Sequence, residues 1–182
     1  LMLLGLLGRS TAGLRLFGNV CAAFLPTAVI GLLFNKLIKQ YLQSTGPVIF
    51  ALAAGGLLMI MFERSKLAKT VRLYGKPLSS LTMRSAFLIG LCQCVAMWPG
   101  TSRSMMTIVG GMALGLEPIA AAEFSFILGL PTLLAATAFK LHKEGPLLMQ
   151  HVGLTSMLVG LAVAAVSATI AVRSFVAYLN RR

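Results

Sequence analysis

Acidic residues are scarce in this sequence. Its 182 residues include 4 Asp or Glu against 16 Lys or Arg, which gives a formal net charge of +12 at pH 7. Charged residues make up only 11% of the chain, whereas hydrophobic residues make up 58%. An ordinary soluble domain has about 25% charged residues, so this composition excludes that class. The chain is therefore predicted to be a polytopic membrane protein.

The excess of basic residues does not predict nucleic-acid binding. These residues lie between apolar runs and form no basic face that alternates with exposed aromatic residues. Such a distribution indicates topology signals and contact with anionic membrane lipids. The densest cluster, in residues 63–84, is expected on the cytoplasmic side, and residues 67–73 are predicted to form a short amphipathic helix at the membrane interface. We expect membrane lipids as partners, and no nucleic acid.

Cysteine and histidine are too few to suggest a disulfide framework or a metal centre. Cys21, Cys92 and Cys94 lie in apolar stretches, where cysteine acts as a small packing residue, and no zinc-binding spacing is present. His142 and His151 are interpreted as surface residues of a polar segment. The sequence also has no low-complexity tract, heptad run or soluble domain. A single membrane domain over residues 1–182 is predicted.

Four apolar runs are long enough, with their flanks, to cross a bilayer: residues 16–37, 48–62, 119–139 and 152–176. Residues 140–150 are polar and are expected to form a loop. Pro26 is expected to kink the first span, with Thr27 satisfying a freed carbonyl. Residues 1–7 are apolar and lack the cationic start and cleavage site of a signal peptide. We interpret them as the tail of a helix and expect the chain to be N-terminally truncated.

The most informative segment is MWPGTSRSMMT, residues 97–107. It lies between two apolar runs that are each too short to cross a bilayer, which takes about 20 residues. Pro99 and Gly100 should stop the incoming helix, and Ser102 or Ser104 can cap the outgoing helix. We predict a re-entrant helix–loop–helix hairpin over about residues 86–116. The alternative is a kinked membrane helix with polar packing residues.

Arg103 is the residue that points most directly to a function. An arginine at membrane depth is costly and usually faces a cavity or a partner. Free N–H groups and the positive end of a helix dipole beside Arg103 predict an anion site. Glu123 is the only carboxylate expected at any depth. It is a candidate ion-pair partner of Arg103, and the alternative that Glu123 faces the headgroups is equally favoured.

The run PGTSRS at residues 99–104, followed by Thr107, resembles the signature of the undecaprenyl-diphosphate phosphatase family, the bacitracin-resistance type. Residues 90–93 and 123–126 fit the same family, and the resemblance runs through most of the chain in order. It implies an all-α polytopic membrane protein, in which transmembrane helices surround a re-entrant helix–loop–helix hairpin. This arrangement would be half of an inverted-repeat architecture, with two broken hairpins meeting at mid-membrane.

The activity that this resemblance implies is hydrolysis of undecaprenyl diphosphate to undecaprenyl phosphate and inorganic phosphate. The reaction recycles the lipid carrier for peptidoglycan synthesis, cell wall biogenesis and cell shape, and it confers bacitracin resistance. The resemblance also implies a multi-pass protein of the bacterial plasma (inner) membrane, a polyprenyl diphosphate lipid as partner, and a divalent cation, Mg²⁺ or Ca²⁺. A homodimer is left open. The alternative function is a secondary transporter or flippase for an anionic lipid, which would use a broken helix in the same way.

The resemblance also assigns roles to individual residues. Arg103, Ser102 and Thr107 are the candidate catalytic residues, and Arg103 would give two parallel donors to the phosphoryl oxygens. The nucleophile and general base are expected upstream of this chain, so the chain alone is expected to have little activity. Ser102 is an alternative nucleophile, although neither a histidine nor a carboxylate adjoins it in sequence. The candidate diphosphate-binding residues are Gly100, Thr101, Ser102, Arg103, Ser104 and Gln93.

Overall fold

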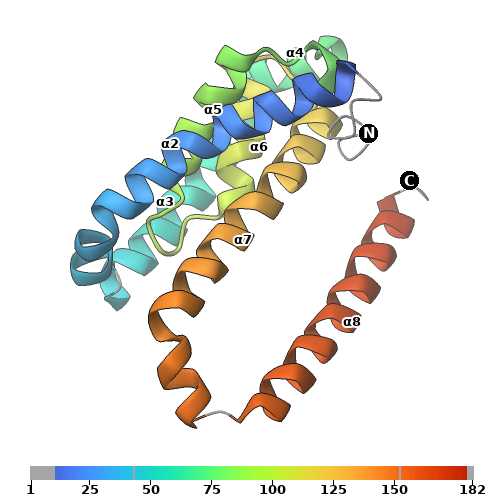
Figure 1. Cartoon of the computed structure of the whole chain (residues 1–182). Helices are drawn as coiled ribbons and strands as arrows, with labels where there is room; N and C mark the ends of the chain where they lie inside the picture. Colours follow the sequence, from blue (N-terminus) through green and yellow to red (C-terminus); the bar gives the residue numbers. More distant parts are fainter. Residues whose placement is uncertain (1–10, 43, 152, 180–182) are drawn as a thin grey trace. The chain divides into compact units, whose positions relative to one another are not determined.

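The computed structural model of the chain describes residues 11–42, 44–151 and 153–179 (Figure 1). In these ranges the regular elements are helices, with one isolated bridge between Lys76 and Leu116. The chain divides into two units, residues 1–134 and 135–182, and α7 contributes residues to both. The elements are α2 (Thr11–Tyr41), α3 (Thr45–Arg64), α4 (Lys66–Tyr74), the 3-10 helix η1 (Leu78–Ser80), α5 (Met83–Val95), α6 (Arg103–Ala113), α7 (Pro118–His151) and α8 (Leu154–Leu179).

Four helices are long and apolar enough to cross a membrane. They are α2 over Ala12–Phe34, α3 over Thr45–Arg64, α7 over Pro118–Lys143 and α8 over Leu154–Ala171. Large apolar side chains of these helices are exposed, which suits contact with lipid because lipid tails need no polar partner; among them are Leu57, Met61, Leu158 and Leu161. The predicted all-α polytopic membrane fold is confirmed.

The polar segment 140–150 is not the predicted loop, because α7 continues through it to His151. Lysine, leucine, glutamate, methionine and glutamine, which make up most of this segment, are all strong helix formers. The helix therefore continues although the sequence becomes polar. The prediction of a loop at residues 140–150 was wrong.

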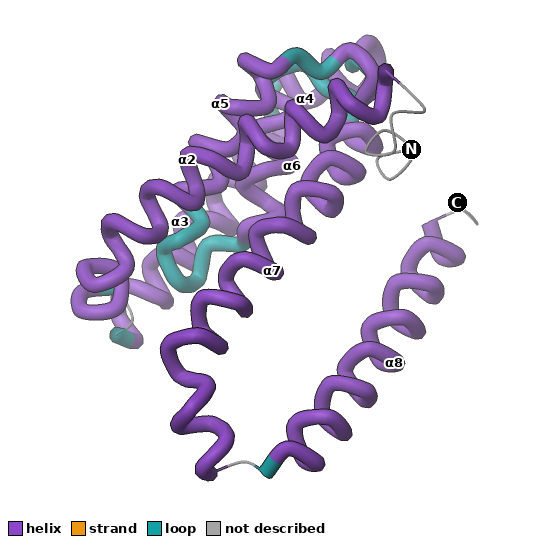
Figure 2. Tube along the Cα trace, in the orientation of Figure 1, coloured by secondary structure: helices purple, strands orange, loops and turns teal. Residues whose placement is uncertain are grey.

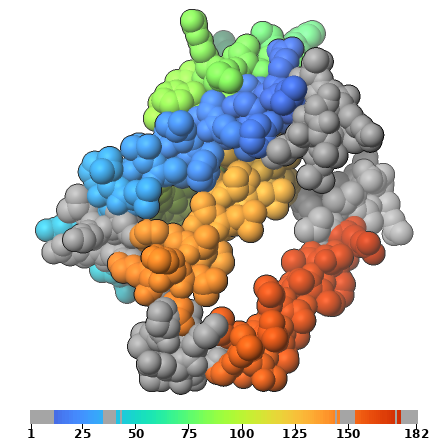
Figure 3. Space-filling model, viewed as in Figure 1, coloured from blue at the N-terminus to red at the C-terminus, as the bar shows by residue number. Residues whose placement is uncertain are grey.

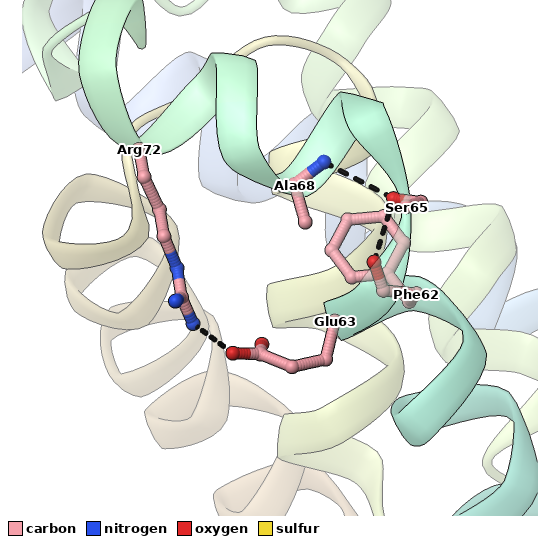
Figure 4. A network of polar contacts seen from close by, with 5 residues as sticks. All are labelled: Phe62, Glu63, Ser65, Ala68 and Arg72. Carbon is pink, nitrogen blue, oxygen red and sulfur yellow. Dashed lines mark hydrogen bonds and ion pairs between the residues drawn. The ribbon is translucent and has the colours of Figure 1, made fainter.

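A sharp corner joins α3 to α4. The Ser65 hydroxyl accepts the backbone N–H of Ala68 at 3.1 Å and donates to the carbonyl of Phe62 at 2.6 Å. Arg72 of α4 forms an ion pair with Glu63 at the end of α3 (Figure 4). Both side chains of the pair are exposed, so we expect it to stabilise the corner only slightly. The helix predicted at residues 67–73 is confirmed, and its location at the membrane interface stays a prediction.

The core of the first unit contains residues from α2, α4, α5, α6 and α7, and its fully buried members include Ala23, Ile89, Phe124 and Leu128. Its most extensive contact between two helices joins α2 and α5, whose side chains lie directly against each other (Figure 3). Gly90 permits this approach, because a Cβ at that position would overlap with the backbone of Ala23. This contact fixes the helix that leads into residues 97–107.

Two polar side chains of α2 donate to backbone carbonyls, one in α5 and one in the turn that precedes α5. Asn19 Nδ2 donates to the carbonyl of Leu81 at 2.9 Å, and Thr27 Oγ1 donates to the carbonyl of Gly90 at 3.2 Å. Thr27 therefore bonds a carbonyl of another helix, and not the one freed by Pro26 as the sequence suggested. The hydrogen bonds of α2 thus hold α5 in a defined register.

Candidate anion-binding site

The segment of residues 96–102 separates two short helices, α5 and α6, that pack against each other (Figure 2). Gly100 has a φ of +102°, and a Cβ there would lie 2.6 Å from the carbonyl oxygen of Val48. Both features require glycine at this position. The predicted break is confirmed, which excludes a continuous kinked helix. That the hairpin re-enters the membrane stays a prediction.

The loop between α5 and α6 is held against the start of α3. The indole N–H of Trp98 donates to the carbonyl of Pro47 at 3.2 Å, and its ring lies 6.0 Å from that of Phe50. The Thr101 hydroxyl donates within the loop to the carbonyl of Trp98 at 2.7 Å. The hydroxyl hydrogen of Thr101 is therefore used in a hydrogen bond within the loop. Only the lone pairs of its oxygen are left for a ligand.

The N-terminus of α6 presents several unused donors. Ser102 is the N-cap residue, and its hydroxyl accepts the backbone N–H of Met105 at 3.4 Å. The Ser102 and Ser104 hydroxyl oxygens lie 3.2 Å apart. The backbone N–H groups of Arg103 and Ser104 precede the first helical hydrogen bond and donate to no acceptor among the described residues. Ser102 is exposed and Ser104 partly exposed, so these groups can receive an anion.

The guanidinium of Arg103 contacts α7. Its Nη1 donates to Thr132 Oγ1 at 3.4 Å, and it packs over Gly129. Glu123 is exposed and lies nine residues from Thr132, which places it about 180° around the helix from the face that meets Arg103. The structure contains no ion pair between Arg103 and Glu123, so the partnership suggested by the sequence is not formed. Arg103 forms no ion pair with a carboxylate among the described residues.

Thr107 lies in the interface between α6 and α7. Its side chain is 1% exposed, and its hydroxyl lies 2.7 Å from Ser125 Oγ. The same hydroxyl also donates to the carbonyls of Arg103 at 3.0 Å and Ser104 at 3.1 Å. The structure thus places Thr107 one turn behind the open end of α6, with its hydroxyl toward α7. The catalytic role suggested for Thr107 stays a prediction.

Gln93 lies in the interface between α5 and α2. It is 2% exposed, and its Nε2 donates to Thr27 Oγ1 at 3.1 Å. Its buried Oε1 has no hydrogen-bond partner among the described residues. The amide therefore contacts α2, whereas the hydroxyls of Ser102 and Ser104 lie at the start of α6. A role for Gln93 in binding diphosphate stays a prediction.

Sequence reasoning missed the α7 residues that meet the site. Ser125, Gly129 and Thr132 contact Thr107 or Arg103, and their spacing of four and three residues places them on one helical face. A search of residues 119–139 for small and hydroxyl side chains at this spacing would have found them. Such a stripe marks where another helix can approach closely.

The described residues do not fit a resident divalent cation. No group of three or more His, Cys, Asp or Glu side chains lies together in residues 11–42, 44–151 and 153–179. The open end of α6 offers N–H and hydroxyl groups beside a guanidinium, whereas Mg²⁺ and Ca²⁺ prefer carboxylates. The involvement of a cation therefore stays a prediction from the resemblance.

Comparisons with known proteins agree with the sequence motif. Residues 3–182 match the family model described as "Bacitracin resistance protein BacA". The chain is 46% identical to a Sorangium cellulosum protein named Undecaprenyl-diphosphatase over 97% of this chain and 58% of that protein. It is 42% identical to a Novosphingobium aromaticivorans protein of the same name, over 98% of this chain and 66% of the relative. The chain thus spans about three fifths of these relatives, and it belongs to the BacA family of bacitracin resistance proteins.

Proposed function

We propose that this chain forms the phosphate-binding part of an enzyme that hydrolyses undecaprenyl diphosphate to undecaprenyl phosphate and inorganic phosphate. The observation that carries the proposal is the position of Arg103, which has no carboxylate partner among the described residues and stands at the open N-terminus of α6. The names of the relatives supply the reaction and the lipid substrate. Recycling of the carrier lipid in the bacterial inner membrane and resistance to bacitracin belong to the same proposal.

The donors at the start of α6 suit phosphoryl transfer. Charge develops on the phosphoryl oxygens in the transition state, and donors that are already in place stabilise it. Arg103 would bind two oxygens through parallel N–H groups. The backbone N–H groups of Arg103 and Ser104 and the hydroxyls of Ser102 and Ser104 would bind further oxygens.

The helices around the site agree with a location inside the bilayer. The α5 helix has 13 residues and α6 has 11, which are too few to cross a membrane, whereas α3 and α7 are long enough. We therefore propose that α5 and α6 enter and leave the bilayer on one side, with the loop at residues 96–102 at depth. A long-chain prenyl lipid could then place its diphosphate at the loop and its tail among exposed apolar side chains. A transporter or flippase of an anionic lipid would also need such a site, but the names of the relatives favour the phosphatase.

The test is phosphate release from purified undecaprenyl diphosphate in detergent. The protein is a chimera in which this chain replaces the 179 matching residues of the Sorangium cellulosum relative, with the 182-residue chain assayed beside it. We expect the chimera to release one phosphate per lipid and the chain alone to release little. A chimera that folds and binds the lipid but leaves the diphosphate intact, while moving it between leaflets of a vesicle, would support the flippase instead.

A further inference from the structure

The side of α7 that faces Arg103 leaves room for the guanidinium at Gly129. A Cβ added at Gly129 would lie 2.8 Å from both Arg103 Nη1 and Nη2, and 3.2 Å from Cζ. These distances mean that the flat guanidinium covers the position that any side chain at residue 129 would occupy. Gly129 is itself buried, so a larger residue at this position would displace the Arg103 side chain.

Thr132 supplies an oriented acceptor one turn further along α7. Its hydroxyl hydrogen is directed to the carbonyls of Leu128 at 3.0 Å and Gly129 at 2.9 Å. Its oxygen lone pairs are therefore left to accept from Arg103 Nη1 at 3.4 Å. The acceptor is neutral, and it takes only one of the five N–H donors of the guanidinium. Thr132 can thus orient Arg103 without neutralising the charge that an anion needs.

The register between α6 and α7 is fixed at a second point. Thr107, four residues after Arg103, contacts Ser125, which lies four residues before Gly129. Two successive turns of α6 therefore meet two successive turns of α7, and the helices cannot slide without breaking both contacts. This register keeps Gly129 and Thr132 of α7 beside the Arg103 guanidinium of α6.

We propose that Gly129 and Thr132 are positioning residues that set the orientation of the Arg103 guanidinium for a phosphate group at the start of α6. The proposal rests on the proposed function for the identity of the anion. Gly129 leaves room for the guanidinium, and the hydrogen bond from Nη1 to Thr132 sets the orientation of the guanidinium. A carboxylate at either place would hold Arg103 more strongly but would compete with the diphosphate for it.

The decisive variant is Gly129→Ala. The atoms that the new methyl group meets are the far end of a flexible side chain, so the protein can fold by moving Arg103. Alanine also favours a helix over glycine, so the melting temperature should stay the same or rise. Because displacement of a reacting group by about 1 Å can cost about a hundredfold, we expect kcat/KM for phosphate release to fall about a hundredfold in the chimera. A merely structural glycine would show the opposite pattern, with lower stability and parent-like kinetics.

Matched variants distinguish the steric role of Gly129 from the hydrogen-bonding role of Thr132. Gly56→Ala in α3 is the control, since no atom lies within 4 Å of its added Cβ, and it should leave kcat/KM unchanged. Thr132→Val removes the acceptor at nearly constant volume and should lower kcat/KM about tenfold, which is the loss of one hydrogen bond to a charged group. Thr132→Ser keeps the acceptor and should restore most of the parent value.

A second readout does not depend on turnover. In the 182-residue chain labelled with ¹⁵N-arginine, the Arg103 guanidinium signal can be assigned by its loss in Arg103→Lys. We expect this signal to shift in Gly129→Ala and to show faster rotation in Thr132→Val, with no change in Gly56→Ala. Unchanged Arg103 signals and parent-like kcat/KM in both α7 variants would overturn the inference, even if the parent chimera releases phosphate. An inactive parent chimera with the expected signal changes would overturn the proposed function and leave the positioning role standing.

Discussion

Thr107 of α6 and Ser125 of α7 are joined by a 2.7 Å contact between two buried hydroxyls. Since Thr107 can direct its hydrogen to the carbonyls of Arg103 and Ser104, Ser125 is the natural donor between them. The pair links the helix that carries the candidate anion site to the helix that contacts Arg103. Loss of this contact should therefore lower the free energy of unfolding and also change the position of Arg103 relative to α7.

We predict that Thr107→Val and Ser125→Ala each lower the free energy of unfolding by about 1–3 kcal/mol, because each leaves a buried polar group with fewer partners. The double variant should lose less than the sum of the two, since the residues share one contact. Thermal melting in detergent measures both effects. The control is Thr169→Val in α8, where an exposed hydroxyl bonds only the carbonyl of Ala165 in its own helix, and it should melt with the parent. Strictly additive losses would show that the two hydroxyls do not interact.

The close approach of α2 and α5 gives a second prediction, for Gly90→Ala. The added methyl group would overlap with the backbone of Ala23, and backbone cannot move aside as a side-chain tip can. We expect destabilisation of about 1–3 kcal/mol, in the range for overpacked cores. Gly56→Ala serves again as control because its added Cβ meets open space. If Gly90→Ala melted at the parent temperature, α2 and α5 would have to lie farther apart than the structure shows.

The re-entrant course of α5 and α6 gives a third prediction. Arg84 at the start of α5 and Leu114 just after α6 are both exposed, and a hairpin that enters and leaves on one side must place them on the same face of the membrane. In a background with Cys21, Cys92 and Cys94 replaced by alanine, single cysteines at these two positions should react with a membrane-impermeant maleimide from the same side. The orientation is read in sealed vesicles of known sidedness. Labelling of the two positions from opposite sides would show that the segment crosses the bilayer.

The local features of the site could be predicted from the sequence because neighbouring residues determine them. Pro99 and Gly100 end a helix by their own backbone chemistry, and Ser102 caps the next one through an N–H three residues away. The short helix α4 likewise follows from apolar residues that recur every three or four positions, as at Leu67, Val71 and Tyr74. Each of these predictions needed only a few adjacent positions, and each is confirmed.

The partner of Arg103 could not be predicted in the same way, because it depends on which face of α7 turns toward α6. Most residues of 119–139 are apolar, so hydrophobicity does not distinguish an inner from an outer face. Charge alone suggested Glu123, whereas packing brings Gly129 and Thr132 to the guanidinium. The length of α7 was missed for a related reason, since polarity in residues 140–150 was interpreted as the end of a helix.

The central claim is that Arg103 binds a phosphate group of the substrate, and Arg103→Ala in the chimera tests it most directly. A hydrogen bond to a charged group contributes about 1.5–3 kcal/mol, and a loss of about 3 kcal/mol is roughly a hundredfold in rate. We predict that phosphate release from a short-chain prenyl diphosphate falls by about that factor. Arg103→Lys should recover little, because one ammonium cannot give two parallel donors. Both variants should melt near the parent temperature, since Arg103 has no ion-pair partner among the described residues. An Arg103→Ala variant that folds normally and releases phosphate at nearly the parent rate would contradict the account.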